Sequence, residues 1–189
     1  MTILEIITPE NPILRRKAKK VEQVTPAMQT LIDDMIATMR EAPGVGLAAP
    51  QVARSVRLFV AEYAEEPSED GKSGSATPAE GDAPPPKPKL YVFINPEIVR
   101  ASEEKAEGAE GCLSIPGYAG TVERHEAVTV KGLNRRGQPV KVKAKGWLAR
   151  IFQHEIDHLD GVLFIDRASR VWKVEDEPDT ARPEAEMLA

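Results

Sequence analysis

The residues best suited to chemistry are two histidines and a glutamate near the end of the chain. They occur in the run His154-Glu155-Ile156-Asp157-His158. Histidines four residues apart lie about one turn apart on one face of an α-helix, so both imidazoles can reach a single metal ion. Glu155 directly follows the first histidine, where its carboxylate can face a water bound to that ion. The pattern predicts a metal-dependent hydrolase, and two exposed helical histidines are the alternative.

A catalytic site of this kind usually needs a third protein ligand and leaves one coordination position open. Cys112 is the only cysteine, so the chain cannot form an internal disulfide bond. It lies between a glycine and a proline, in Glu-Gly-Cys-Leu-Ser-Ile-Pro, and a buried structural cysteine is the alternative interpretation. The remaining histidine, His125, follows Arg124 at a predicted strand edge. We therefore predict that Cys112, His154 and His158 are the metal ligands.

A glycine-containing segment at residues 44–51 is a third candidate. It reads Gly-Val-Gly-Leu-Ala-Ala-Pro-Gln, without the lysine and hydroxyl residue of a phosphate-binding loop. One interpretation is a glycine that ends a helix, followed by a packed turn of small residues. The other is a backbone that a peptide can approach closely, ending in the amide side chain of Gln51. The segment alone does not distinguish them.

Three segments together resemble the sequence motifs of peptide deformylases. They are GVGLAAPQ at 44–51, EGCLS at 110–114 and QHEIDH at 153–158, in this order. The resemblance covers residues 1 to about 170, apart from residues 65–89. It implies an enzyme that removes the formyl group from the N-terminal formylmethionine of nascent polypeptides, a step of N-terminal protein processing during translation.

The resemblance also implies roles for individual residues. Cys112, His154 and His158 match the metal ligands of the family, and Glu155 matches its catalytic glutamate. Gln51 and the backbone amide of Leu113 match the groups that hold the formyl oxygen. The residues that match the substrate-binding positions are Val45, Gly46, Gly117, Tyr118 and Ile151. Ala119 stands where some members of the family have an arginine.

This implied role gives a hypothesis for the reaction. The metal lowers the pKa of its bound water toward about 7, so that hydroxide attacks the formyl carbon at neutral pH. Glu155 takes the proton as general base and then delivers it to the leaving amine as general acid. The family resemblance implies Fe²⁺ as the native cofactor, with Zn²⁺ or Ni²⁺ possible as isolated, because a Cys-His-His ligand set suits several divalent metals.

Two other kinds of protein are compatible with the histidine pattern. A metalloprotease would need a third ligand downstream, where Asp160 and Asp166 are the available carboxylates. A non-catalytic protein with a structural metal would need a fourth protein ligand, which would have to be His125. Cleavage of internal peptide bonds distinguishes the first from a deformylase, and the effect of His125→Ala on stability distinguishes the second.

Composition and charge limit the choice of partners. A length of 189 residues suits one domain. The net charge of −5 predicts no direct contact with nucleic acid. No apolar run approaches the roughly 20 residues that span a bilayer, and Glu5 interrupts the start of the chain, so we expect a cytoplasmic protein without membrane contact. The expected partners are N-formylmethionyl peptides. Residues 175–177 are acidic, so they do not support a transient contact with the ribosome.

The pattern of apolar residues predicts an α+β fold. A helix is expected from Pro26 to just before Pro43, and a second one over residues 147–159. The predicted strands are 56–63, 90–94, 98–101, 122–123, 127–133 and 140–144. We expect antiparallel or mixed sheets packed around the helix that bears the two histidines, in a single domain over residues 1–170 with an acidic tail at 171–189. Residues 65–89 contain six prolines and predict a disordered insertion loop.

Overall fold

The computed structural model describes residues 1–64 and 87–176, which form an α+β fold of two antiparallel sheets and two α-helices. The five-stranded sheet has the order β1-β2-β3-β6-β7, formed by Gly46–Ala48, Leu58–Tyr63, Lys89–Ala101, Ala127–Leu133 and Pro139–Lys145. The three-stranded sheet has the order β4-β5-β8, formed by Lys105–Gly111, Tyr118–His125 and Arg170–Lys173. The helices are α1, Pro26–Glu41, and α2, Gly146–Asp160. The predicted fold class is confirmed.

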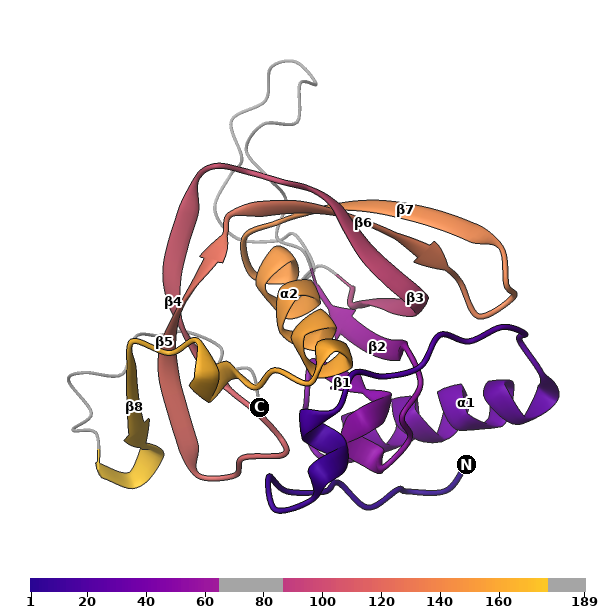
Figure 1. Ribbon diagram of the computed structural model, residues 1–189, viewed down its shortest axis with the longest axis horizontal. Coiled ribbons are helices and arrows are strands. Elements are labelled where there is room, and N and C mark those ends of the chain that lie inside the picture. The colour runs from indigo at the N-terminus through magenta and orange to yellow at the C-terminus, as the bar shows by residue number, and fades with distance from the viewer. Residues whose placement is uncertain (65–86, 177–189) are drawn as a thin grey trace.

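Helix α2 lies at the centre of the molecule, with the three-stranded sheet on one side and the five-stranded sheet around the other (Figure 1). All its residues from Leu148 to Leu159 are buried. It ends at Asp160 and is capped by Gly161, which has a φ of 78° and donates its N–H to carbonyls of the last turn. Glycine adopts this left-handed conformation without steric cost, so it is a common helix terminator. The two predicted histidines therefore lie on a buried helix.

Helix α1 covers the opposite face of the five-stranded sheet. Thr25 caps its first turn by accepting a hydrogen bond from the Met28 N–H, and Pro26 occupies the first helical position. The apolar stripe of α1 contributes Ile32, Met35, Ile36 and Met39 to a core shared with residues of β1, β2 and β3. Within β2, Leu58 and Val60 belong to this core, whereas Phe59 belongs to the core beneath α2. Successive side chains of β2 point to opposite faces of the sheet, so this strand contributes to both cores.

The predicted end of a strand at Asn95 is wrong. Strand β3 continues through this position to Ala101, with shifts in its pairing to β6 between Ile94 and Glu97. Asn95 has a φ of 52°, and its side chain bonds the backbone N–H and C=O of Val21. An asparagine tolerates this conformation better than most residues, so it forms a bulge and the strand goes on.

Several strands were not predicted in full. Strand β4 was missed, only two residues of β5 were expected, and Arg170–Lys173 forms β8 against β5. The predicted disordered loop at 65–89 falls mostly on residues outside the described ranges, but Lys89 begins β3. Most of the predicted tail also lies outside these ranges, and the division of the chain at residue 170 stays a prediction. No helix among the described residues is long and apolar enough to cross a bilayer.

Candidate metal centre and active site

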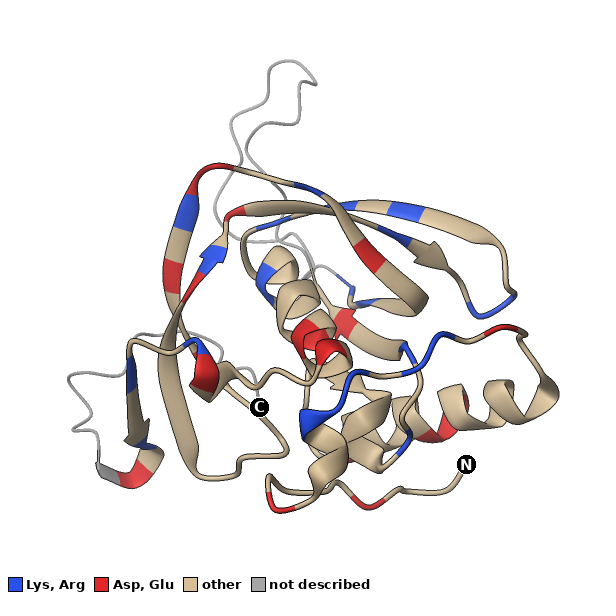
Figure 2. Ribbon diagram, in the orientation of Figure 1, with Lys and Arg blue, Asp and Glu red and all other residues tan. Residues whose placement is uncertain are grey.

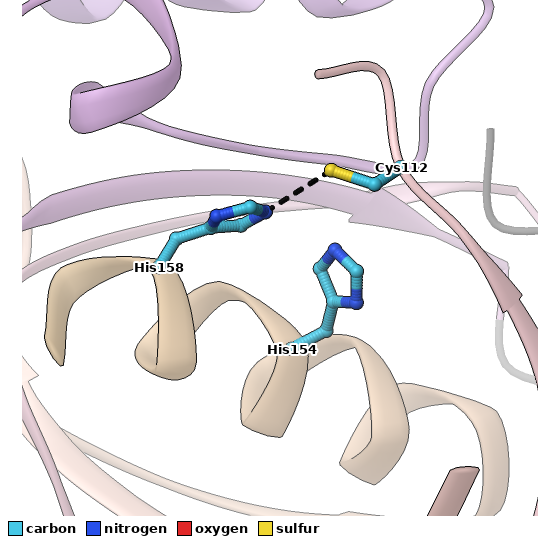
Figure 3. A group of neighbouring side chains, drawn as sticks. All are labelled: Cys112, His154 and His158. Carbon is cyan, nitrogen blue, oxygen red and sulfur yellow. Dashed lines mark hydrogen bonds between the residues drawn. The ribbon is translucent and has the colours of Figure 1, made fainter. Parts of the chain in front are cut away.

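Three buried side chains converge between α2 and the end of β4. The ligand atoms of Cys112, His154 and His158 all lie within 4.8 Å of one another. The Cys112 Sγ is 3.3 Å from the His158 Nε2, and the two imidazole rings meet edge to face with centroids 4.9 Å apart (Figure 3). The structure therefore brings together the three residues that we predicted as metal ligands.

Two different elements carry these three residues. His154 and His158 are one turn apart on α2, so the helix fixes the spacing of their rings. Cys112 directly follows Gly111, the last residue of β4. The sulfur can face the rings only because the three-stranded sheet packs against the helix.

The outer nitrogens of the two imidazoles have different environments. The Nδ1 of His154 lies 3.0 Å from a carboxylate oxygen of Glu110, whereas the Nδ1 of His158 is buried and has no hydrogen-bond partner among the described residues. Burial lowers the pKa of His158 well below its usual value, so this imidazole is neutral, the form that binds metals. Burial works in the same direction on His154, but the hydrogen bonds that its ring donates to Cys112 and Glu110 raise its pKa well above the usual value.

Glu155 is buried beside the triad and opposite β1. Its Oε2 has no hydrogen-bond partner among the described residues. A β-carbon added to Gly46 would lie 2.3 Å from its Oε1, so only glycine leaves room for the carboxylate there. Burial raises the pKa of Glu155 to about 7. A carboxyl group with this pKa can both accept and donate a proton near neutrality.

A small cavity opens onto these groups. It is lined by Val45, Gly46, Gln51, Gly111, Cys112, Leu113, Ile151, His154 and Glu155. The Nε2 of Gln51 lies 3.5 Å from the Cys112 sulfur, while its Oε1 accepts the Ala48 N–H at 2.8 Å, which fixes the orientation of the amide. The cavity therefore joins the thiol, the helix and the glycine-containing segment at one point.

Two of the predicted substrate-binding residues lie outside the lining of this cavity. Gly117 occupies a turn with a φ of 79°, and Tyr118 begins β5 with 40% of its surface exposed. The other three, Val45, Gly46 and Ile151, line the cavity. The structure thus divides the predicted set between the cavity wall and a more distant surface.

The donor set fits a divalent transition metal. One thiol and two imidazoles are typical ligands for zinc or iron, and three protein ligands leave a position for water or substrate. The ligands that the alternative functions require are engaged elsewhere. Asp160 pairs with Arg57, and Asp166 accepts the Leu163 N–H. The Nδ1 of His125 lies 2.6 Å from the Ser102 carbonyl oxygen.

The sequence did not reveal the buried charges behind His154. Glu110 accepts hydrogen bonds from Arg124 and Arg150, and Arg124 also contacts Asp157. Burial alone would raise the pKa of Glu110, but the bonds from Arg124 and His154 hold it well below the usual range, so the group is an anion. The one sequence feature that could have indicated these charges is the placement of Arg124 and Arg150 at core-facing positions of a strand and a helix.

The sequence is similar to those of known peptide deformylases. The sequence profile of the polypeptide deformylase family matches residues 3–174. A peptide deformylase from Symbiobacterium thermophilum is 47% identical over 177 residues, which cover 94% of this chain and 72% of that protein. Peptide deformylase 2 from Nostoc sp. is 49% identical over 166 residues, which cover 87% of this chain and 86% of that protein.

Solved structures give the same result. A crystal structure of a peptide deformylase from Legionella pneumophila is 42% identical, with a TM-score of 0.73 and coverage of 89% of this chain and 87% of that one. The peptide deformylase from Ehrlichia chaffeensis, in complex with actinonin, is 39% identical, with a TM-score of 0.75 and coverage of 90% and 91%. The chain therefore belongs to the polypeptide deformylase family, metal-dependent hydrolases that remove the formyl group from the N-termini of polypeptides.

Proposed function

We propose that Cys112, His154 and His158 hold the divalent ion of this deformylase, with Fe²⁺ as the native metal and Zn²⁺ or Ni²⁺ as substitutes. The observation that carries the proposal is the convergence of their ligand atoms within 4.8 Å, beside a buried carboxylate oxygen of Glu155 that has no hydrogen-bond partner in the described part of the chain. A divalent ion at this position polarises a carbonyl group and lowers the pKa of water. A thiolate and two imidazoles can bind Fe²⁺, Zn²⁺ or Ni²⁺, and geometry and metal availability decide which ion is held.

Glu155 is the general base and acid in this proposal. It lies in the wall of the cavity that Cys112 and His154 also line, and Gly46 leaves its carboxylate room on the side of β1. From there it accepts the proton of the attacking water and returns it to the leaving amine. General acid–base catalysis of this kind contributes typically 10²–10⁴-fold to a rate.

Gln51 and the backbone N–H of Leu113 stabilise the developing negative charge on the formyl oxygen. The Gln51 amide is held in place because its oxygen accepts the Ala48 N–H, which leaves the NH₂ group directed toward Cys112. A donor that is fixed before the reaction costs no reorganisation when charge develops. Loss of one such donor typically raises a barrier by about 3–4 kcal/mol.

The substrate in this proposal is the formylmethionine at the start of a nascent polypeptide. Val45 and Ile151 give the cavity apolar walls for the methionine side chain, and Gly46, which also lines the cavity, pairs through its backbone with the substrate chain. Gly117 and Tyr118 contact residues further along the substrate. We propose that the enzyme acts in the cytoplasm; its acidic residues 175–177 do not support a transient contact with the ribosome.

Release of formate from a formyl-Met peptide tests the proposal directly. The protein should release formate after anaerobic loading with Fe²⁺ and lose this activity on addition of a chelator. Glu155→Gln should keep the metal and lower kcat by at least about 10²-fold. Glu107→Gln, the same change at an exposed position of β4, is the control and should keep the wild-type rate. Normal turnover by Glu155→Gln, or cleavage of internal peptide bonds in place of formate release, would contradict the proposal.

A further inference from the structure

The proposed metal ligands come from two elements that are far apart in the sequence, so something must fix the distance between them. The histidines belong to α2, and Cys112 follows β4. Apolar packing alone determines such a distance poorly, because it has no preferred direction. Directional bonds between α2 and the three-stranded sheet would hold it more closely.

Arg150 makes such bonds from the buried surface of α2. Its NH1 donates to a Glu110 oxygen and to the Val122 carbonyl, both at 2.8 Å, and its NH2 donates to the Ala106 carbonyl at 2.7 Å. Ala106 and Glu110 belong to β4, and Val122 belongs to β5. One guanidinium group thus joins the helix to two neighbouring strands, and one of its acceptors is the carboxylate that contacts His154.

The backbone of β4 is adapted to this contact at Gly108. A β-carbon at that position would lie 2.8 Å from the Arg150 Cζ. Gly108 therefore lets the guanidinium lie directly against the strand. A lysine could not replace the arginine equivalently, because an ammonium group lacks the planar fork that reaches several fixed acceptors.

We propose that Arg150 is a positioning residue that sets the distance between the Cys112 sulfur and the two imidazoles. The proposal rests on the metal ligands assigned under the proposed function. Among the described residues Arg150 makes no hydrogen bond to the ligand atoms, and it acts through Glu110 and through β4, the strand that directly precedes Cys112. Loss of Arg150 should lower the affinity for the metal by about 10-fold or more, as does the loss of other groups that orient metal ligands.

Arg57 provides a matched control within the same protein. It donates to two backbone carbonyls, those of Leu159 and Pro96, and to the carboxylate of Asp160. It therefore has the same kinds of acceptor as Arg150, but it joins the end of α2 to the five-stranded sheet. Arg57→Met should lower the thermal stability without loosening the contact between Cys112 and the histidines.

The experiment compares metal release by the wild type, Arg150→Met, Arg150→Lys and Arg57→Met, each loaded with Co²⁺. Thiolate-to-cobalt absorption reports whether Cys112 is bound, and its decay on addition of a chelator gives the release rate. We expect Arg150→Met to release the ion at least about 10-fold faster than the wild type and Arg57→Met at close to the wild-type rate. Arg150→Lys should fall between wild type and Arg150→Met.

Gly108→Ala gives an independent test that leaves Arg150 in the chain. The new methyl group would displace the guanidinium, so this variant should also release Co²⁺ faster, even if Arg150→Met does not fold. Equal release rates in the wild type and the folded Arg150 and Gly108 variants would overturn the positioning role, as would equally fast release from Arg57→Met. A wild type without thiolate-to-cobalt absorption would instead contradict the proposed metal ligands.

Discussion

The two sides of α2 are held by different kinds of interaction. Toward the five-stranded sheet, Phe152 packs against the rings of Phe59 and Phe93, with centroids 5.7 and 5.3 Å away. Toward the three-stranded sheet, the helix uses Arg150 and Asp157, which pair with the buried charges of β4 and β5. Figure 2 shows acidic and basic residues on α2 and on the strands beside it.

This difference suggests that one side of α2 contributes mainly to the stability of the fold and the other mainly to the placement of the metal ligands. Apolar packing contributes free energy in proportion to the area buried, and small shifts cost little as long as the volume stays filled. Buried charges add little net stability because desolvation offsets their attraction, but each charge requires its partner in place. We infer that the aromatic side of α2 stabilises the fold and that the charged side determines where the Cys112 sulfur meets the histidines.

The largest effect should come from removing an aromatic ring. Phe152→Ala should lower the free energy of unfolding by about 3–5 kcal/mol, because the cavity left beneath α2 cannot collapse fully. Under conditions in which the protein remains folded, its affinity for Co²⁺ should stay close to that of the wild type. Urea denaturation and competition with a chelator measure the two quantities.

Phe164→Ala is the corresponding change on the other side. Phe164 is as buried as Phe152, but its ring stacks near His154, with centroids 6.4 Å apart. We expect a similar loss of stability together with weaker metal binding. If both variants lost metal affinity equally, the separation between a stabilising side and a positioning side would be wrong.

Removal of the Glu110 charge should have the next largest effect. Glu110→Gln weakens the hydrogen bond that orients His154, so the affinity for Co²⁺ should fall by about 10–100-fold. We expect a smaller loss of unfolding free energy than in Phe152→Ala, because Arg124 keeps Asp157 as an acceptor and Arg150 keeps two carbonyls. Chelator competition measures the affinity, and an unchanged value would show that Glu110 has no role in metal binding. Glu107→Gln, on the same strand, is the control.

The regular part of the fold could be predicted because single patterns specify it. The apolar residues of α1 recur at helical spacing after the Thr25-Pro26 cap, and the strand over 127–133 agrees with β6. Strand β4 could not be predicted, since Lys-Ala-Glu-Gly-Ala-Glu-Gly has two glycines and no β-branched residue. Pairing with β5 makes it a strand, and that pairing is set by the tertiary structure.

The candidate site was predictable to a similar extent. Two histidines on one helical turn are a local pattern, and Cys112, the only cysteine, was the best candidate for the third ligand that they lacked. The partners of Glu110 are not local, because Arg124 and Arg150 follow it by 14 and 40 residues. Nothing in the sequence alone distinguishes a buried arginine that holds a carboxylate from an exposed one. The supporting charges of the site therefore became visible only in the structure.

The smallest effect should come from a charge pair at the surface. The Arg40 guanidinium donates two hydrogen bonds to Glu62, at 2.6 and 2.7 Å, and these bonds lower the pKa of that carboxyl group. Arg40→Gln should cost less than about 1 kcal/mol of unfolding free energy at pH 7, because solvent screens an exposed pair.

The pH dependence of this cost has a definite sign. A lowered pKa in the folded state means that the pair stabilises the protein above the unfolded pKa of glutamate, about 4.3, and that this contribution disappears as the pH falls through the folded value. The difference between wild type and Arg40→Gln should therefore be largest near pH 7 and vanish in acid. It should also shrink in 1 M salt, whereas the effect of Glu110→Gln on Co²⁺ affinity should persist, because salt screens buried charges much less.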